Sequence, residues 1–254
     1  MRLKSAQWLV VCVLLASCDK VPDRAPTLAE LKVGDKVKAS GKWLMSVPNG
    51  LTRLDAPPNL SRHAVVAVHG YGSRGYEWVD ALKVMGASGA QVYFFRWDWR
   101  RCPRPAAQAL SEAIEALVKG DAEIDRLTVL GHSYGGLVAA IMAQDHAPPL
   151  MMDLHVVAAP LAGHEKLTGR CDFEGLSSAA PRANVAIHQW RTVKAQDGAF
   201  KSLERDPQVV VLSGSEVTRL PAMWNGRRLG HNWSVSWVAR QIQSGAADRA
   251  GGSE

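Results

Sequence analysis

Three kinds of signature are missing from this chain of 254 residues, and each absence excludes a class of protein. The sequence has no H-E-x-x-H zinc motif, no P-loop and no G-x-G-x-x-G dinucleotide motif, so we expect neither a metal nor a cofactor. Its formal charge is a mild +6 with scattered basic residues, which argues against nucleic-acid binding. No apolar run is long enough to cross a bilayer as a helix. With 47% hydrophobic residues, the composition fits one globular domain.

Cysteine is also scarce, and two of the four cysteines lie in an unusual N-terminal segment. Arg2 and Lys4 precede a nine-residue apolar run, Trp8 to Ala16, which is typical of a signal-peptide core. The following Leu15-Ala16-Ser17-Cys18 resembles the bacterial lipobox. This resemblance implies cleavage behind Ser17 and lipidation of Cys18; an ordinary secretory signal is the alternative.

The N-terminal pattern sets the expected organisation of the chain. We predict a lipoprotein signal peptide over residues 1–17, a lipidated tether over 18–31, the folded domain over 32–245 and a flexible tail over 246–254. The protein is then expected in a bacterial cell envelope, anchored through Cys18 and facing the periplasm. Asp19 resembles an inner-membrane sorting signal, but that rule varies between bacteria, so the choice of membrane stays open.

Two cysteines, Cys102 and Cys171, remain for the folded domain. Disulfides persist outside the cytosol, and both residues lie in basic, loop-like contexts. We expect a Cys102–Cys171 bridge, with two free thiols as the alternative.

The stretch from Leu127 to Ala143 carries the strongest local signal. Leu127 to Leu130 suits a buried strand, and Gly135 to Ala143 suits a buried helix. Between them lies Gly131-His132-Ser133-Tyr134-Gly135, a G-x-S-x-G motif. In a sharp strand-to-helix turn this spacing exposes the serine hydroxyl, and the flanking glycines leave room for the bend.

The pattern around this motif alternates between apolar strand-like runs and helix-like segments, which predicts a mostly parallel α/β sheet with helices on both faces. At the start of the domain, residues 36–47 and 51–54 are predicted to form an opening β-hairpin. Near its end, His231 is predicted to lie in a turn before the last helix. The expected strands are 64–68, 91–95, 127–130, 154–158, 185–193 and 209–212, and the expected helices are 76–85, 106–118, 135–143 and 233–243.

Together, His69-Gly70 after one strand, the Ser133 elbow after a later one and a late His231 resemble the α/β-hydrolase fold in its lipase/esterase branch. The resemblance covers roughly residues 64–243. It implies that the short, glycine-rich stretch 161–183 forms a cap over the site. Loop tryptophans are candidates to line the pocket: Trp97, Trp99 and Trp224.

The resemblance also implies roles for individual residues. Ser133 would be the nucleophile, His231 the base and Asp197 the acid, with Glu216 and then Asp206 as alternative acids. The oxyanion would be bound by the backbone N–H groups of Tyr71 and Tyr134. The other seven histidines, His69 and His132 among them, are expected to be structural or on the surface.

The predicted function is hydrolysis of carboxylic esters, on a small-molecule or lipid substrate, through an acyl-enzyme. The same triad would serve thioester or amide cleavage, or acyl transfer to an alcohol, and fold alone does not choose among them. Lipase action on long acyl chains is a sub-case. A non-catalytic envelope lipoprotein that uses the fold as a binding or scaffold module is the alternative from another class.

Overall fold

The computed structural model describes residues 22–55 and 60–251, with side chains described up to residue 245. The predicted signal peptide and the predicted lipidation site, Cys18, therefore lie outside the described residues. Within the described part of the chain, no helix is both long and apolar enough to span a membrane.

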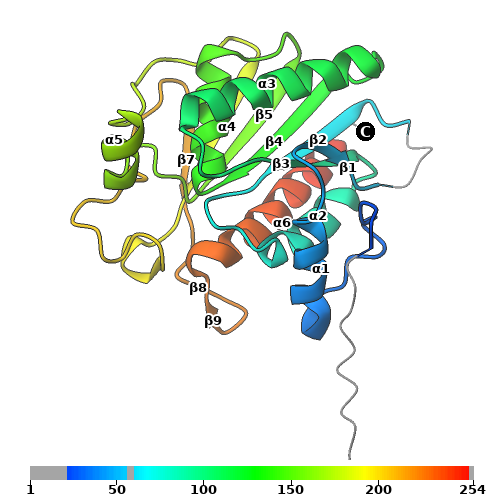
Figure 1. Cartoon of the computed structure of the whole chain (residues 1–254), viewed down its shortest axis with the longest axis horizontal. Coiled ribbons are helices and arrows are strands. Elements are labelled where there is room, and N and C mark those ends of the chain that lie inside the picture. The colour runs from blue at the N-terminus through cyan, green and yellow to red at the C-terminus, as the bar shows by residue number, and fades with distance from the viewer. Residues whose placement is uncertain (1–21, 56–59, 252–254) are drawn as a thin grey trace, which may run out of the picture.

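A seven-stranded sheet runs through the centre of the molecule in the order β1-β3-β2-β4-β5-β6-β7 (Figure 1). Only β1 runs antiparallel to its neighbour; every other pair is parallel. The central strands are continuous apolar runs, as expected for strands that are buried on both faces. The strands are β1 (Gly50–Arg53), β2 (His63–Val68), β3 (Gln91–Arg96), β4 (Arg126–His132), β5 (Met151–Val157), β6 (Val185–Arg191) and β7 (Glu216–Arg219).

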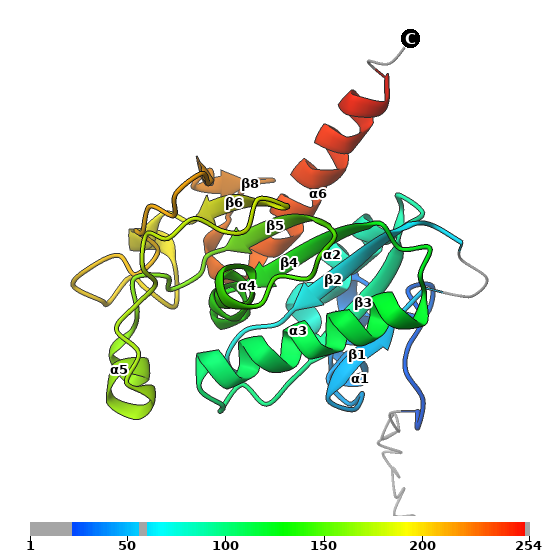
Figure 2. The ribbon, with the colours of Figure 1, turned by 90° about the horizontal axis from the view of Figure 1, so that it is seen from above.

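Helices cover both faces of this sheet (Figure 2). On one face, α3 (Pro103–Gly120) and α4 (Tyr134–Asp145) pack over alternate strand residues such as Val66 and Val129. On the other face lie α1 (Val37–Leu44), α2 (Tyr76–Gly86) and α6 (Gly230–Gly251). Parallel strands put their carboxyl ends on one edge, so the loops after β2, β4 and β6 meet there. The predicted α/β-hydrolase architecture is confirmed.

The predicted opening hairpin is wrong, because residues 37–44 form helix α1 and only β1 is a strand. Ser40, Gly41 and Leu44 are buried and recur at helical spacing. Gly41 also lies against the start of α2, where an added Cβ would come within 2.3 Å of the Tyr76 nitrogen. A one-turn pattern of small residues signals helix–helix packing weakly, whereas the turn-like Pro48-Asn49-Gly50 between the two segments favours a hairpin.

The C-terminal third differs in two further places. Residues 209–212 do not form a strand: Val209 and Val211 are exposed, and the last strand of the sheet is β7. A short hairpin of β8 (Met223–Trp224) and β9 (Arg227–Arg228) then precedes α6. Helix α6 begins at Gly230, so His231 lies in its first turn rather than in a loop.

Both ends of the folded part extend beyond the predicted boundaries. Leu31, assigned to the tether, is fully buried, and the N–H of Leu28 donates to the carbonyl of Leu54 at 2.7 Å. The residues just before position 32 therefore pack on the domain. At the other end, α6 continues to Gly251, into the segment 246–254 that was expected to be a tail.

Candidate active site

The site begins at the sharp bend between β4 and α4. Ser133 has φ 55° and ψ −125°, a left-handed conformation that costs a non-glycine residue on the order of 1–3 kcal/mol. Its N–H donates to the carbonyl of Val157 at 2.8 Å, which ties the bend to β5. A strained serine held between a strand and a helix is the nucleophile-elbow geometry that the motif predicts.

The glycines of the motif are required by close backbone approach. A Cβ on Gly131 would lie 2.7 Å from the Gly136 Cα, and one on Gly135 would lie 2.3 Å from the Val68 carbonyl oxygen. Gly70, in the loop after β2, leaves equally little room, because its Cβ would lie 2.9 Å from the Ser133 Cβ. The elbow and the loop after β2 therefore touch only because these positions lack side chains.

His231 and Asp197 meet beside the elbow. The His231 Nδ1 donates to the Asp197 Oδ2 at 2.9 Å. Because Nδ1 carries the proton in this bond, Nε2 is left free to accept one. Ser133 and His231 line the same cavity. Their side chains are not hydrogen bonded to each other in the described part of the chain, a contact that often tightens only when substrate binds.

Asp197 is fully buried and held as a carboxylate. Burial alone would raise the pKa of this carboxyl, but the hydrogen bond and charge of His231 outweigh it, with help from Thr192 and Ala199, and the pKa is lowered. The Thr192 hydroxyl donates to Oδ2, and the Ala199 N–H donates to Oδ1 at 2.8 Å. Gln208 in turn accepts from the Thr192 N–H at 2.8 Å. An anion held in this way can orient the imidazole and stabilise its protonated form.

The two alternative acids lie elsewhere. Glu216, on β7, is exposed and pairs with the Nδ1 of His188 on the neighbouring strand at 3.1 Å. Asp206 accepts from the backbone N–H and the side chain of Gln208. Of the three candidates, only Asp197 is hydrogen bonded to His231 in the described structure.

Two buried histidines, His132 and His69, form hydrogen bonds next to the site. The His132 Nε2 donates to the His231 carbonyl oxygen at 3.0 Å, and the two rings lie 4.6 Å apart. His69 accepts the Trp97 N–H at 3.3 Å, and its carbonyl accepts the Trp97 indole N–H at 2.9 Å. Burial lowers the pKa of His132 to about 3 and that of His69 to about 4, so both are neutral near pH 7. Structural roles for His69 and His132 are what the sequence predicts, but nothing in the sequence indicates the His132 bond that fixes His231.

The two residues predicted to supply the oxyanion donors line the same cavity as Ser133. Tyr134 is the first residue of α4, and the first amides of a helix have no intrahelical acceptor. Tyr71 follows Gly70 and, like Tyr134, lines the cavity that contains Ser133. The Tyr134 ring is tied down, since its hydroxyl donates to the Arg101 carbonyl at 2.6 Å. Both backbone N–H groups can therefore belong to one anion-binding corner beside Ser133.

A cavity of about 680 Å³ opens above Ser133 and His231. Apolar side chains make up part of its wall: Tyr71, Trp99, Leu167 and Phe200. Of the three loop tryptophans, only Trp99 lines it; Trp97 is buried against His69, and Trp224 packs on Trp233. The volume and mixed lining suit a small organic substrate.

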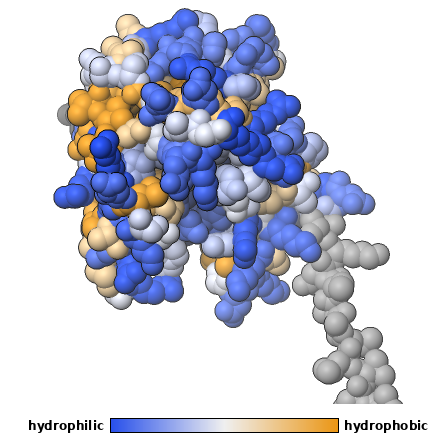
Figure 3. Space-filling model, turned by 60° about the vertical axis from the view of Figure 1, so that its left-hand side comes forward, coloured by the Kyte–Doolittle hydropathy of each residue, from blue (hydrophilic) through white to orange (hydrophobic). Residues whose placement is uncertain are grey.

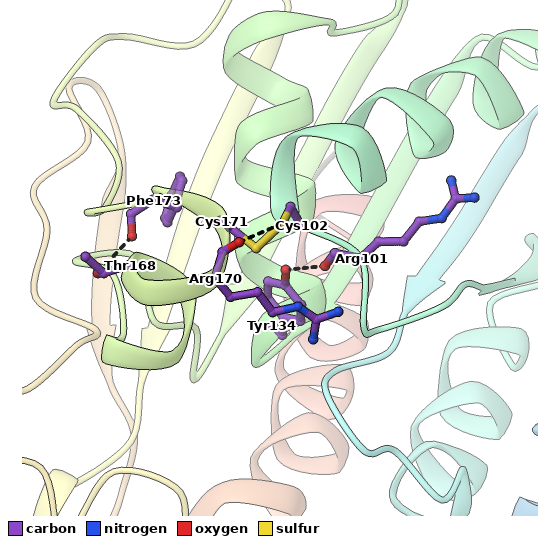
Figure 4. The surroundings of a disulfide bond; sticks show 7 residues. All are labelled: Arg101, Cys102, Tyr134, Thr168, Arg170, Cys171 and Phe173. Carbon is purple, nitrogen blue, oxygen red and sulfur yellow. Dashed lines mark hydrogen bonds between the residues drawn. A yellow bond between two sulfur atoms is a disulfide. The ribbon is translucent and has the colours of Figure 1, made fainter.

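Helix α5 (Glu165–Cys171) forms the outer wall of this cavity and belongs to the predicted cap. In Figure 1 it stands away from the main body of the sheet. Cys102 and Cys171 form a disulfide that ties α5 to the start of α3 (Figure 4). The pairing expected from the sequence is thus the one present in the structure, and it holds the cap in place.

Replacing both cysteines by alanine is expected to lower the free energy of unfolding by about 2–4 kcal/mol, because the bridge closes a long loop in the unfolded chain. The two cysteines are 69 residues apart in the sequence, so the loop that the bridge closes is long. Urea unfolding of the double variant should show a lower midpoint than the oxidised protein. Reduced wild-type protein is the control and should match the variant; a change below about 0.5 kcal/mol would contradict the expectation.

Several site residues carry no signal in the sequence. Thr192 and Gln208 support Asp197, and Phe200 packs edge-on against His231 at 5.0 Å. Lys166 and Arg170 of α5 line the cavity. Each of these residues is identified only by its position in the folded structure, because none lies in a sequence motif.

Comparison with solved structures gives the same fold. An esterase of Pyrococcus furiosus, Pf2001, aligns at 14% identity over 75% of this chain and 82% of its own, with a TM-score of 0.50. Est1E of Butyrivibrio proteoclasticus, solved with ferulic acid, aligns at 11% identity over 79% and 96%, with a TM-score of 0.52. ATU1826 of Agrobacterium tumefaciens, a protein of unknown function, aligns at 11% over 81% and 96%, with a TM-score of 0.53.

No curated protein sequence matches the chain significantly. The profile of the alpha/beta hydrolase family matches residues 65–247, which cover the sheet from β2 onward, the elbow and His231. This match spans well over half of the sequence. The chain therefore belongs to the alpha/beta hydrolase family.

Proposed function

We propose that this chain is a serine hydrolase that cleaves carboxylic esters with Ser133 as nucleophile. One observation carries the proposal: a strained elbow serine shares a cavity with His231, whose Nδ1 donates to the buried Asp197. A serine hydroxyl is a weak nucleophile at neutral pH unless a base is within reach. The arrangement supplies that base and a carboxylate to orient it.

The reaction follows from these positions. The His231 Nε2 accepts the Ser133 proton while the serine oxygen attacks the ester carbonyl carbon. The backbone N–H groups of Tyr71 and Tyr134 stabilise the oxyanion, and each such donor is worth on the order of a hundredfold in rate. His231 then returns the proton to the leaving alkoxide. Water hydrolyses the acyl-enzyme by the same steps, with His231 again as base.

The proposal extends to location. We infer a lipid-anchored protein of the bacterial cell envelope, supported by the lipobox-like sequence that ends at Cys18 and by the Cys102–Cys171 disulfide. Disulfides of this kind persist in the periplasm and are rare in the cytosol. The active-site cavity would then face the periplasm, where extracytoplasmic esters are accessible.

Covalent labelling tests the function directly. A fluorophosphonate probe should add one phosphonyl group to the peptide that contains Ser133, and the purified protein should hydrolyse p-nitrophenyl butyrate. Intact-protein and peptide mass spectrometry should show the adduct in the wild type and none in Ser133→Ala. Ser202→Ala, which removes an exposed serine, is the matched control and should label normally. Folded wild-type protein that neither labels nor hydrolyses esters would favour a non-catalytic binding module.

A further inference from the structure

Two cations lie on the cap helix beside the catalytic cavity. Lys166 and Arg170 are four residues apart in α5, so they lie on the same side of the helix. Both line the cavity that contains Ser133 and His231. Like charges at this spacing repel each other by a few tenths of a kcal/mol. Their placement therefore costs the helix stability rather than adding to it.

Neither cation has a carboxylate partner within ion-pair distance in the described part of the chain. Arg100, another residue of the cavity wall, differs in this respect because its Nε donates to Asp98 at 2.9 Å. Glu165, the acidic residue among those lining the cavity, is exposed and forms no ion pair with any described residue. The charges of Lys166 and Arg170 are thus free to act on a ligand.

Each cation lies near the side chain of a tyrosine whose N–H group is proposed to bind the oxyanion. The Lys166 Nζ lies 6.0 Å from the centre of the Tyr71 ring. Burial raises the pKa of the Tyr134 phenol to about 12, and the nearby charge of Arg170 opposes that rise. Figure 4 shows the Arg170 side chain running from α5 toward Tyr134, whereas the side chain of Arg101 points the other way. Both tyrosines line the cavity that contains Ser133.

The cap holds Arg170 in a defined place. Its carbonyl oxygen lies 4.0 Å from the Cys102 Sγ, and the next residue is bridged to that cysteine (Figure 4). The Thr168 hydroxyl donates to the carbonyl of the buried Phe173 at 3.2 Å. The backbone that carries Arg170 is therefore fixed before any ligand binds, which lowers the entropy cost of binding.

We propose that Lys166 and Arg170 form an anion-binding subsite and that the substrate ester carries a negatively charged group close to its scissile bond. This inference rests on the proposed ester hydrolysis by Ser133. A guanidinium presents paired N–H donors to a carboxylate or phosphate, and a lysine adds a mobile positive charge. A carboxylate and a phosphate would be bound by the same donors and charges. The proposed substrate class is therefore an anionic ester, with the acid that carries the charge left unspecified.

The rest of the cavity limits what else the substrate contains. Tyr71 and Trp99 pack with ring centres 4.4 Å apart, and Leu167 and Phe200 add apolar wall. The side of the molecule that carries α5 shows apolar patches between hydrophilic side chains (Figure 3). An ester with an apolar body and one charged end matches this lining.

Two matched pairs of esters test the proposal, one for each side of the scissile bond. The acyl pair is p-nitrophenyl hemiglutarate and p-nitrophenyl butyrate. The leaving-group pair is 4-butyryloxybenzoate and its methyl ester. In each pair one member is anionic and the other neutral. We expect the anionic member of at least one pair to have the higher kcat/KM, and the advantage to shrink as the ionic strength rises from about 0.02 to about 0.5 M.

Variants show whether the preference comes from the cap. Arg170→Ala should reduce the anionic-to-neutral ratio of kcat/KM about tenfold, because the lost charge acts mainly on the anionic ester. Arg170→Lys should retain part of the preference because the charge remains. Arg182→Ala, an exposed arginine outside this cavity, is the matched control and should leave the ratio as in the wild type. Thermal unfolding of each variant checks that the cap is intact.

Two results would overturn the subsite while leaving ester hydrolysis in place. One is a wild-type protein that cleaves the neutral member of both pairs at least as well as the anionic member. The other is an Arg170→Ala variant that loses activity equally on both members, because this would mean a general effect on the site. Failure of the proposed function looks different: no ester of either pair is cleaved and Ser133 takes up no fluorophosphonate.

Discussion

Asp197→Asn should lower kcat for ester hydrolysis about ten-thousandfold, with a much smaller change in KM. The carboxylate accepts the His231 Nδ1 proton at 2.9 Å and so leaves Nε2 free for Ser133. An asparagine can instead present its N–H₂ to Nδ1, which stabilises the tautomer with the proton on Nε2. That tautomer cannot accept the serine proton. Steady-state kinetics with p-nitrophenyl butyrate measures the loss.

Glu216→Gln is the matched control, because Glu216 was the next candidate for the acid. Its carboxylate pairs with His188 at the β6–β7 edge, and the side chain is exposed. The substitution should change kcat by less than about threefold, as expected for an exposed ion pair. A large loss in Glu216→Gln, or Asp197→Asn activity within about tenfold of the wild type, would mean that another residue serves as the acid.

The sheet and the elbow were accessible from sequence because their signals are local. Val65 to Val68 and Leu127 to Leu130 are apolar runs that only a doubly covered strand explains, and Ser133 lies between glycines. Chain order then placed His231 and Asp197 after the elbow. The secondary structure predicted for segments that are only partly buried was wrong. Residues 37–44 bury a single small-residue face, and the apolar residues 209–211 remain largely exposed.

The supporting contacts of the site could not be read from the sequence. His132 lies inside the G-x-S-x-G motif, but its bond to the His231 carbonyl depends on how α6 docks beside β4. Thr192 reaches Asp197, and Gln208 reaches Thr192, because the segment that follows β6 folds back on itself. Each contact depends on how single side chains meet in the folded chain, and a periodic pattern of apolar residues does not encode such contacts.

In the cap, a disulfide holds a helix that is too short to be stable alone, so that the helix can form one wall of the cavity. Helix α5 is 7 residues long, far below the length at which a helix is stable alone. The Cys102–Cys171 bridge anchors its last residue, and the two cations on it face the cavity. Without the bridge, the free energy for holding Lys166 and Arg170 near Ser133 would have to come from few buried contacts. The disulfide therefore links stability to the proposed substrate preference.

The buried histidines make a strong pH dependence of stability the second large effect to expect. The unfolded chain binds protons at His69 and His132 near the ordinary pKa of about 6.5, whereas burial lowers the folded-state pKa to about 4 and about 3. Their contribution is complete above the unfolded pKa and is lost as the pH falls toward the folded pKa. Between pH 7.5 and 4.5, the free energy of unfolding should fall on the order of 5 kcal/mol.

Urea unfolding across this pH range measures the effect, and variants assign it. Replacing His132 by glutamine should remove about half of the slope, because glutamine does not titrate but keeps an N–H donor for the His231 carbonyl. His146→Gln changes an exposed histidine and should leave the slope as in the wild type. If the wild-type stability were flat between these pH values, both imidazoles would have to take up protons in the folded state. His132 would then carry a charge directly behind His231, and the base proposed for catalysis would sit beside a cation instead of a neutral donor.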